Sequence, residues 1–84
     1  MIVLDIGHTY QIRNHETDAS KEDSYQTLQF IKKEKQGDAF VTIQNGTTNE
    51  EVLAVLIDRL NTLSRKLPSR ETSIAITKCE EALL

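Results

Sequence analysis

The pattern of apolar and polar positions changes character near the middle of the 84-residue chain. Before residue 46 the apolar positions recur about every second residue and turn-forming residues are frequent, which is typical of short β-strands. After that point they recur every three or four residues, as on one face of an α-helix. The sequence therefore predicts a single α+β domain over residues 1–84. A small antiparallel β-sheet in residues 1–45 precedes an antiparallel α-helical hairpin in residues 46–84.

The sequence pattern of residues 1–45 predicts several short strands joined by turns and loops. Apolar or alternating runs predict three strands at residues 2–4, 10–13 and 25–33. Gly7 predicts a turn or bulge between the first two strands. Residues 14–23 contain no large apolar side chain, which predicts a solvated loop. Residues 35–38 contain Gly37 and predict a hairpin turn into a further strand at residues 39–43.

A helix start follows at once. Thr47 and Thr48 are each followed three residues later by a glutamate, which is the spacing of a capping box. Apolar residues then form a heptad-like seam over about 18 residues; its members are Leu53, Leu56, Leu60, Leu63 and Leu67. The neighbouring apolar side chains of Val52, Val55 and Ile57 widen this seam. The helix must therefore bury a second face against the sheet or against another subunit.

Pro68 predicts the end of the first helix, because the residue before a proline is biased away from the helical conformation. Ser69 is a suitable cap for a second helix that starts at Arg70. In that helix a core stripe is expected at Ile76, Cys79 and Leu83, with Ile74, Ala75 and Ala82 beside it. The short link makes the two helices antiparallel.

Size and charge narrow the range of partners. A chain this short buries only roughly 60–65% of its unfolded surface, so assembly with further copies is a natural way to bury more. The formal net charge of −3 argues against a protein that follows a DNA or RNA polymer by neutralising phosphates. A compact anionic ligand needs only two or three well-placed donors, and an acidic protein can supply these locally.

The sequence also bears on the compartment. No apolar run approaches the roughly 18–20 residues of a membrane span, so no membrane association is expected. Cys79 is the one cysteine and cannot form an internal disulfide. A reducing cytoplasm is therefore the expected location.

No catalytic or metal-binding constellation is recognisable. His8 and His15 lie seven positions apart on an expected strand and in a loop, and Cys79 has no histidine nearby in sequence. Metal-ligand spacings and a phosphate-binding glycine loop are absent as well. We therefore expect no enzymatic activity, no metal and no cofactor.

Polar residues at the helix starts allow two interpretations each. Thr48 and Asn49 precede free backbone N–H groups, so they form either an anion site or a plain N-cap. Arg70 stands in the first turn of the second helix, where a cation opposes the helix dipole. With Lys66 before it, Arg70 is either placed for an anionic partner or is one of two solvated charges.

The length of the first helix limits how these residues combine. About 18 residues span roughly 27 Å, so Thr48 and Arg70 of one chain lie at opposite ends of the hairpin. If two hairpins pack antiparallel through the leucine seam, Arg70 and Lys66 of one chain approach Thr48 and Asn49 of the other. Two further residues lie outside the hairpin. Phe40 is the nearest aromatic for stacking on a base, with core packing as its alternative, and Arg13 is placed to contact ribose or phosphate.

Several segments resemble one known family. NGTTNEEVL, VLIDRL, PSRE, AITK and EEAL, together with GHTYQI and LQFIKKE in the first half, are similar to the phage sponge family that comprises Thoeris anti-defence and anti-CBASS proteins. The likeness covers most of the chain and is strongest to the Thoeris branch.

The resemblance implies a function and a set of contacts. It implies a protein that sequesters a cyclic ADP-ribose isomer, or a related cyclic di- or trinucleotide, without cleaving it, in the cytoplasm of an infected bacterial host cell. Thr48, Asn49, Arg70, Lys66 and Phe40 would contact the ADP-ribose ligand. Thr77 and Lys78 would contact a cyclic oligonucleotide, or would simply form a solvated helix face. The resemblance also implies a homo-oligomer, a dimer or a higher species such as a hexamer.

A second function class stays open. The helical hairpin could act as an oligomerisation or protein-interaction module that uses the apolar surface of Val52, Val55 and Ile57. In that case the polar helix starts serve only as caps. A nucleotide-cleaving enzyme would need a base and nucleophile pair, which the sequence lacks.

Overall fold

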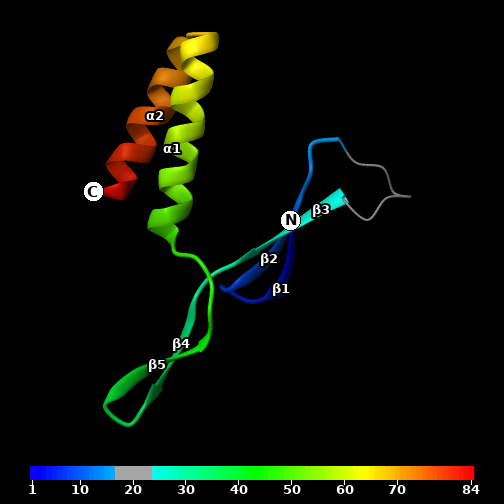
Figure 1. Ribbon diagram of the computed structural model, residues 1–84, viewed down its shortest axis with the longest axis vertical. Coiled ribbons are helices and arrows are strands. Elements are labelled where there is room, and N and C mark those ends of the chain that lie inside the picture. Colours follow the sequence, from blue (N-terminus) through cyan, green and yellow to red (C-terminus); the bar gives the residue numbers. More distant parts are fainter. Residues whose placement is uncertain (17–23) are drawn as a thin grey trace. The chain divides into compact units, whose positions relative to one another are not determined.

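The computed structural model describes residues 1–16 and 24–84; residues 17–23, which belong to the expected solvated loop 14–23, lie outside the described residues. Its elements are β1 (Ile2–Asp5), β2 (Thr9–Arg13), β3 (Tyr25–Gln29), β4 (Lys32–Gln36), β5 (Ala39–Gln44), α1 (Asn49–Lys66) and α2 (Arg70–Leu83). Figure 1 shows these elements in chain order. Two small antiparallel sheets followed by two helices confirm the α+β fold. The chain forms two compact units, Met1–Thr47 and Thr48–Leu84.

The first sheet of the N-terminal unit has the order β1–β2–β3, with antiparallel pairing throughout. Gly7 forms the turn between β1 and β2 and has a φ of +77°. The backbone N–H of His8 donates to the carbonyl of Asp5 at 3.0 Å. A positive φ at the third residue of the turn is what a type II turn requires, so glycine is favoured at this position. The strands predicted at residues 2–4 and 10–13 and the turn predicted at Gly7 are confirmed here.

The second sheet is the hairpin β4–β5. Gln36 pairs with Ala39, so the turn consists of two residues, Gly37 and Asp38. Gly37 has a φ of +64°, and a glycine with positive φ at the first turn position is typical of the tight type II′ hairpin. The turn predicted at residues 35–38 was therefore too long, because Lys35 lies within β4.

The single strand predicted at residues 25–33 is wrong. It is interrupted at Phe30, whose backbone N–H donates to the carbonyl of His8 at 2.7 Å, and the next N–H, of Ile31, donates to the carbonyl of Thr47 at 2.9 Å. Two adjacent N–H groups thus bond to two different segments. A single ladder cannot continue through such a point, so the run divides into β3 and β4.

Side chains connect the two sheets within this unit. The Nζ atom of Lys32 lies 3.1 Å from Oδ2 of Asp5, and Nε2 of Gln44 donates to Oγ1 of Thr9 at 3.2 Å. Both contacts join the hairpin β4–β5 to the strands β1 and β2. They fix the hairpin against the first sheet at the end where β4 begins and β5 ends.

The helical unit starts and stops where the sequence predicts. The side chain of Thr48 caps α1 by accepting from the backbone N–H of Glu51 at 3.2 Å. The side chain of Ser69 caps α2 in the same way, accepting from the N–H of Thr72 at 3.1 Å. Thr47, the other predicted cap, instead forms a parallel bridge with Phe30.

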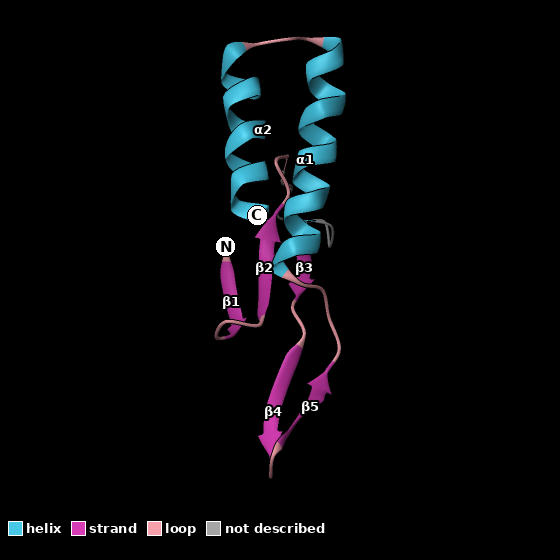
Figure 2. Ribbon diagram, turned by 90° about the vertical axis from the view of Figure 1, so that its left-hand side faces the viewer, coloured by secondary structure: helices cyan, strands magenta, loops and turns pink. Residues whose placement is uncertain are grey.

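The leucine seam of α1 divides between two environments. The half-buried residues of α1 include Leu53, Ile57 and Leu60, and those of α2 include Ile76 and Cys79. Spacings of three and four residues mark these side chains as the contact between the antiparallel helices, which lie side by side in Figures 1 and 2. Three members of the predicted seam are exposed instead, namely Leu56, Leu63 and Leu67. Leu83, expected in the core stripe of α2, is exposed as well.

Much apolar surface remains uncovered. No side chain in residues 1–16 and 24–84 reaches the burial typical of a protein core, and Val55 is 60% exposed. Large exposed apolar surfaces mark interaction sites in soluble proteins, and a small domain without a closed core gains most from association. None of the helices in the described part of the chain is long and apolar enough to cross a membrane.

Candidate ligand-binding site

One exposed face of α2 gathers three of the residues singled out in the sequence. Arg70, Thr77 and Lys78 line a shallow groove together with Ser73 and Ile74. The spacings of three and four positions between these residues place them on one helical stripe. The sequence had suggested Arg70 for one ligand and the Thr77–Lys78 pair for another. In the structure the three side chains belong to the same surface.

The two cationic side chains of this groove differ in whether they already have a polar partner. Lys78 has its Nζ atom 3.7 Å from Oε2 of Glu81, with both side chains largely exposed. Such a surface pair contributes little and is easily exchanged for another anion. Arg70 has no ion pair or hydrogen bond within the described residues. Its guanidinium is therefore available, and it can present two parallel N–H donors to a phosphate or carboxylate.

The hydroxyl groups between these cations are partly engaged. Ser73 Oγ donates to the carbonyl of Ser69 at 3.1 Å, and Thr77 Oγ1 donates to the carbonyl of Ser73 at 3.1 Å. Their lone pairs remain free to accept from a ligand, and rotation about the Cβ–Oγ bond would let them donate instead. Sequence reasoning missed Ser73. Its position three residues after Arg70 and four before Thr77 was the signal that could have found it.

The N-terminus of α1 shows the capping interaction directly. Thr48 and Asn49 are both exposed, and Oγ1 of Thr48 accepts from Glu51 as described above. Capping therefore occupies one lone pair of this oxygen. The backbone N–H groups of the first turn still carry the partial positive charge of a helix start.

A single hairpin does not bring both groups of predicted residues together. Thr48 precedes the first residue of α1, whereas Lys66 is the last residue of this 18-residue helix. Helix α2 returns antiparallel beside it (Figure 2), so Arg70 lies at the same end as Lys66. At 1.5 Å per residue the two ends are about 27 Å apart. The geometric separation expected from the sequence is thus confirmed.

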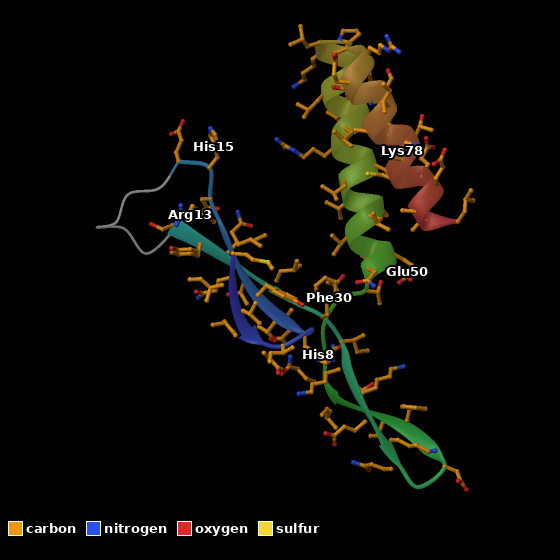
Figure 3. All side chains as sticks on the ribbon, turned by 180° about the vertical axis from the view of Figure 1, so that it is seen from behind. His8, Arg13, His15, Phe30, Glu50 and Lys78 are labelled. Atoms are coloured by element: carbon orange, nitrogen blue, oxygen red, sulfur yellow. The ribbon has the colours of Figure 1, made fainter. Side chains whose placement is uncertain are left out.

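Arg13 and Phe40 belong to the N-terminal unit. Arg13 is exposed at the end of β2, where Figure 3 labels it, and pairs across the sheet with Tyr25. Phe40 lies on β5 opposite Lys35 and is 71% exposed. Core packing, the alternative role for Phe40, is therefore not observed. An exposed aromatic ring beside a lysine is suited to stacking on a base near a phosphate.

The side chains of this groove are suited to binding a ligand. The groove on α2 supplies a guanidinium, an ammonium and two hydroxyls, which recognise anionic and hydroxyl-bearing ligands. Across residues 1–16 and 24–84, no group of three histidine, cysteine or acidic side chains is placed to hold a metal ion.

The comparison with protein families gives a match that includes the whole helical hairpin. The sequence model described as "Acb2/Tad1, hairpin domain" matches residues 18–84, well over half of the chain. The chain belongs to the Acb2/Tad1 family. This family consists of phage anti-defence sponge proteins, among them the anti-CBASS protein Acb2 and the Thoeris anti-defence protein Tad1. The family resemblance seen in the sequence is therefore confirmed. A comparison with curated proteins gives no match.

Membership in the Acb2/Tad1 family also fixes the general role. Its proteins act as sponges, which sequester a molecule rather than convert it. The groove on α2 and the N-terminus of α1 both lie within the matched hairpin. A general role as a phage anti-defence sponge follows from membership in this family.

Proposed function

We propose that this protein binds a cyclic ADP-ribose-type immune signal and holds it without cleaving it, so that the Thoeris effector is not activated. A related cyclic di- or trinucleotide of the CBASS type is a second ligand of the same protein. The proposed place of action is the cytoplasm of the infected bacterial cell. No cofactor takes part.

The observation that carries this proposal is the exposed face of α2. Arg70, Thr77 and Lys78 line one groove there, and the chain belongs to a family of sponge proteins. Cyclic signalling nucleotides combine phosphates with ribose hydroxyls and bases. A free guanidinium, an ammonium and two hydroxyls in one groove match the first two of these groups.

The complete pocket requires a second copy of the chain. Thr48 and Asn49 are about 27 Å from the Lys66–Arg70 end of the same hairpin. When two hairpins pack antiparallel, that end of one copy approaches the N-terminus of α1 in the other, and twofold symmetry generates two equivalent pockets. Phe40 and Arg13, on the N-terminal unit, are proposed as further ligand contacts, through base stacking and a cationic contact respectively.

Sequestration acts by mass action. A binder without turnover removes only as many signal molecules as it has sites, so the protein must be present in at least stoichiometric amount. Its dissociation constant must lie below the working concentration of the signal. Slow release prolongs the effect, because differences in affinity between related complexes are mostly differences in off-rate.

The test is recovery of the ligand. The purified protein is mixed with a panel of cyclic ADP-ribose isomers and cyclic di- and trinucleotides, separated from free ligand, and then denatured. Mass spectrometry identifies what is released. Unchanged nucleotide supports a sponge, whereas a cleaved product would make the protein an enzyme. Retention of no nucleotide from the panel would contradict the proposal.

A second candidate function rests on the exposed apolar surface of α1. Val55 is 60% exposed, although Val52 and Ile57, which the sequence grouped with it, are half-buried. A protein-interaction module would use this surface and leave the polar helix starts as caps. The ligand-recovery experiment separates the two functions, because such a module retains no nucleotide.

A further inference from the structure

The Asn45–Gly46 pair, which follows β5, brings a side-chain amide and a backbone nitrogen together. The backbone N–H of Gly46 donates to Oδ1 of Asn45 at 3.0 Å, so the side chain of Asn45 is folded back over the peptide nitrogen that follows it. Both residues are exposed. Within residues 1–16 and 24–84, this N–H has no backbone acceptor. The nitrogen is therefore neither held in a β-ladder nor shielded from solvent.

The fold of the N-terminal unit requires a glycine at position 46. A Cβ atom there would lie 2.5 Å from the carbonyl carbon of Phe30 and 2.7 Å from its carbonyl oxygen, and backbone atoms cannot rotate out of the way. Glycine is also the residue that leaves its own nitrogen least hindered, because it has no side chain. The packing requirement thus places an unhindered nitrogen next to the amide of Asn45.

We propose that Asn45 and Gly46 form a site of spontaneous covalent modification, at which Asn45 loses its side-chain amide as ammonia. A base in solution removes the proton from the nitrogen of Gly46. This nitrogen attacks Cγ of Asn45 and forms a new C–N bond. The bond from Cγ to the side-chain nitrogen then breaks, and that nitrogen takes up a proton and leaves as ammonia. The product is a cyclic imide.

Water is the co-reactant that opens the imide. Addition of water at Cγ of Asn45 breaks the new C–N bond and gives aspartate. Addition at the main-chain carbonyl carbon breaks the original peptide bond instead and gives isoaspartate, in which the chain continues through the side chain. The net change in both cases is the gain of one water and the loss of one ammonia, with no oxidation or reduction.

The hydrogen bond between the two residues favours ring closure. Cγ of Asn45 is one carbonyl bond, about 1.2 Å, from Oδ1, so it lies close to the nitrogen that attacks it. The terminal torsion of an asparagine side chain is broad, and a rotation about it turns Cγ toward that nitrogen. Holding the reacting atoms near their attack geometry removes much of the entropic cost of a reaction. The folded chain is therefore preorganised for this step.

The three other asparagines of the chain are internal controls. Asn49 and Asn61 lie in α1, where the helical backbone must unwind before the ring can close. Oδ1 of Asn14 accepts from Nε2 of Gln26 at 2.7 Å. None of the three is followed by glycine.

Isoaspartate at position 45 should loosen the N-terminal unit. The carbonyl of Asn45 accepts from Nε2 of Gln29 at 2.7 Å, and the N–H of Thr47 donates to the carbonyl of Gln29 at 2.8 Å. Isoaspartate lengthens the main chain by one methylene between these two anchors, beside a glycine that has no space to move toward Phe30. Both hydrogen bonds cannot then be kept. This consequence is independent of the proposed nucleotide ligand.

Ageing of the purified protein tests the site. The protein is incubated in neutral buffer, sampled over time, digested and mapped by mass spectrometry, and isoaspartate is counted with an isoaspartyl methyltransferase and labelled S-adenosylmethionine. Amide loss at Asn45 should be at least about tenfold faster than at Asn14, Asn49 or Asn61. The rate should rise with pH, because the deprotonated nitrogen is the nucleophile. Water enriched in heavy oxygen should label the new carboxyl group.

Two variants separate the chemistry from its consequence. Asn45→Gln keeps a side-chain amide but must close a larger ring, so it should lower the rate of amide loss at this position about tenfold or more. Asn45→Asp carries the charge of the product on an unmodified main chain. Its midpoint of urea denaturation should stay near that of the fresh protein, whereas the isoaspartate fraction of aged protein should unfold at lower urea.

The same chain in denaturing guanidinium chloride shows whether the fold contributes. A rate of amide loss at Asn45 in the folded protein at least equal to that in the denatured chain supports the proposal. A lower rate in the folded protein would show that the fold protects Asn45, and would overturn it. Equal rates at all four asparagines, or the absence of isoaspartate, would overturn it as well. An isoaspartate fraction as stable as fresh protein would overturn the loosening of the unit. Ligand recovery tests the proposed function separately.

Discussion

A Cβ atom added at Gly46 would lie 2.5 Å from the backbone carbonyl carbon of Phe30. It would also lie 2.5 Å from the carbonyl oxygen of Gln29. The segment that leads into α1 therefore crosses the end of β3 with no space for a side chain. The backbone N–H of Thr47, the next residue, donates to the carbonyl oxygen of Gln29 at 2.8 Å.

Gly46→Ala should accordingly destabilise the N-terminal unit. The clashing atoms are backbone atoms, which cannot rotate away, so the crossing must open; we expect a loss of about 1–3 kcal/mol in the free energy of unfolding. Gly46 does not have a positive φ. At such a position alanine would otherwise stabilise the protein by about 0.4–1 kcal/mol through the unfolded state. Urea denaturation gives the sign, and a stabilised variant would disprove the close crossing.

Leu60→Asp should unfold the hairpin rather than act only on assembly. Leu60 is half-buried on α1, and a carboxylate there is poorly solvated, at a cost of several kcal/mol. Circular dichroism at 222 nm should show a clear loss of helix. Leu56→Asp is the matched control, because Leu56 is 43% exposed on the same helix and should keep its helical signal. The opposite ranking of the two variants would mean that the seam faces the other way.

Arg70→Ala should weaken nucleotide binding by about 2–4 kcal/mol, measured by isothermal titration calorimetry, if the guanidinium contacts a phosphate. The helix should not suffer, because removing a cation from the first turn relieves an unfavourable dipole interaction. Arg70→Lys should recover only part of the affinity, since an ammonium lacks the planar fork. Arg65→Ala, on the last turn of α1, is the control. Unchanged affinity in Arg70→Ala would leave Arg70 as a solvated charge.

Mixing two defective variants tests whether the pocket spans two chains. Arg70→Ala and Asn49→Ala each damage both pockets of a homodimer. After subunit exchange, a mixed dimer has one intact pocket and one doubly damaged pocket, so up to half of the sites in mixed dimers should bind. Asn49 is preferred to Thr48 because Thr48→Ala also removes the N-cap, at about 1 kcal/mol. Absence of any recovery in a preparation shown to contain mixed dimers would argue against a shared pocket.

The sequence predicted correctly those features of the fold that depend on residues close together in the chain. The caps at Thr48 and Ser69, and the stop at Pro68, follow from residues within one helical turn, and all three were predicted correctly. The break at Phe30 was missed because it depends on Thr47, seventeen positions away, and on the absence of a side chain at Gly46. No alternation of apolar and polar residues within 25–33 contains that information.

The candidate site shows the same limit. Arg70, Thr77 and Lys78 were found because their residue types are distinctive, but their common face became clear only with the helix in place. Ser73 was missed because an isolated serine in a helix has no chemical signature. The seam of leucines indicated an apolar stripe correctly. It could not indicate that Leu60 is half-buried while Leu56 remains exposed, since periodicity describes one helix without its neighbours.

The central claim is that the protein removes a signal by holding it, and a titration of free signal tests this most directly. A fixed amount of the cyclic ADP-ribose isomer that the protein retains is incubated with increasing amounts of protein, and the unbound nucleotide is measured in the ultrafiltrate. The account predicts a linear fall to a sharp endpoint set by the number of sites, no further change with time, and full return of unchanged nucleotide on heating. A free concentration that keeps falling with time at substoichiometric protein, or that never falls, would contradict it.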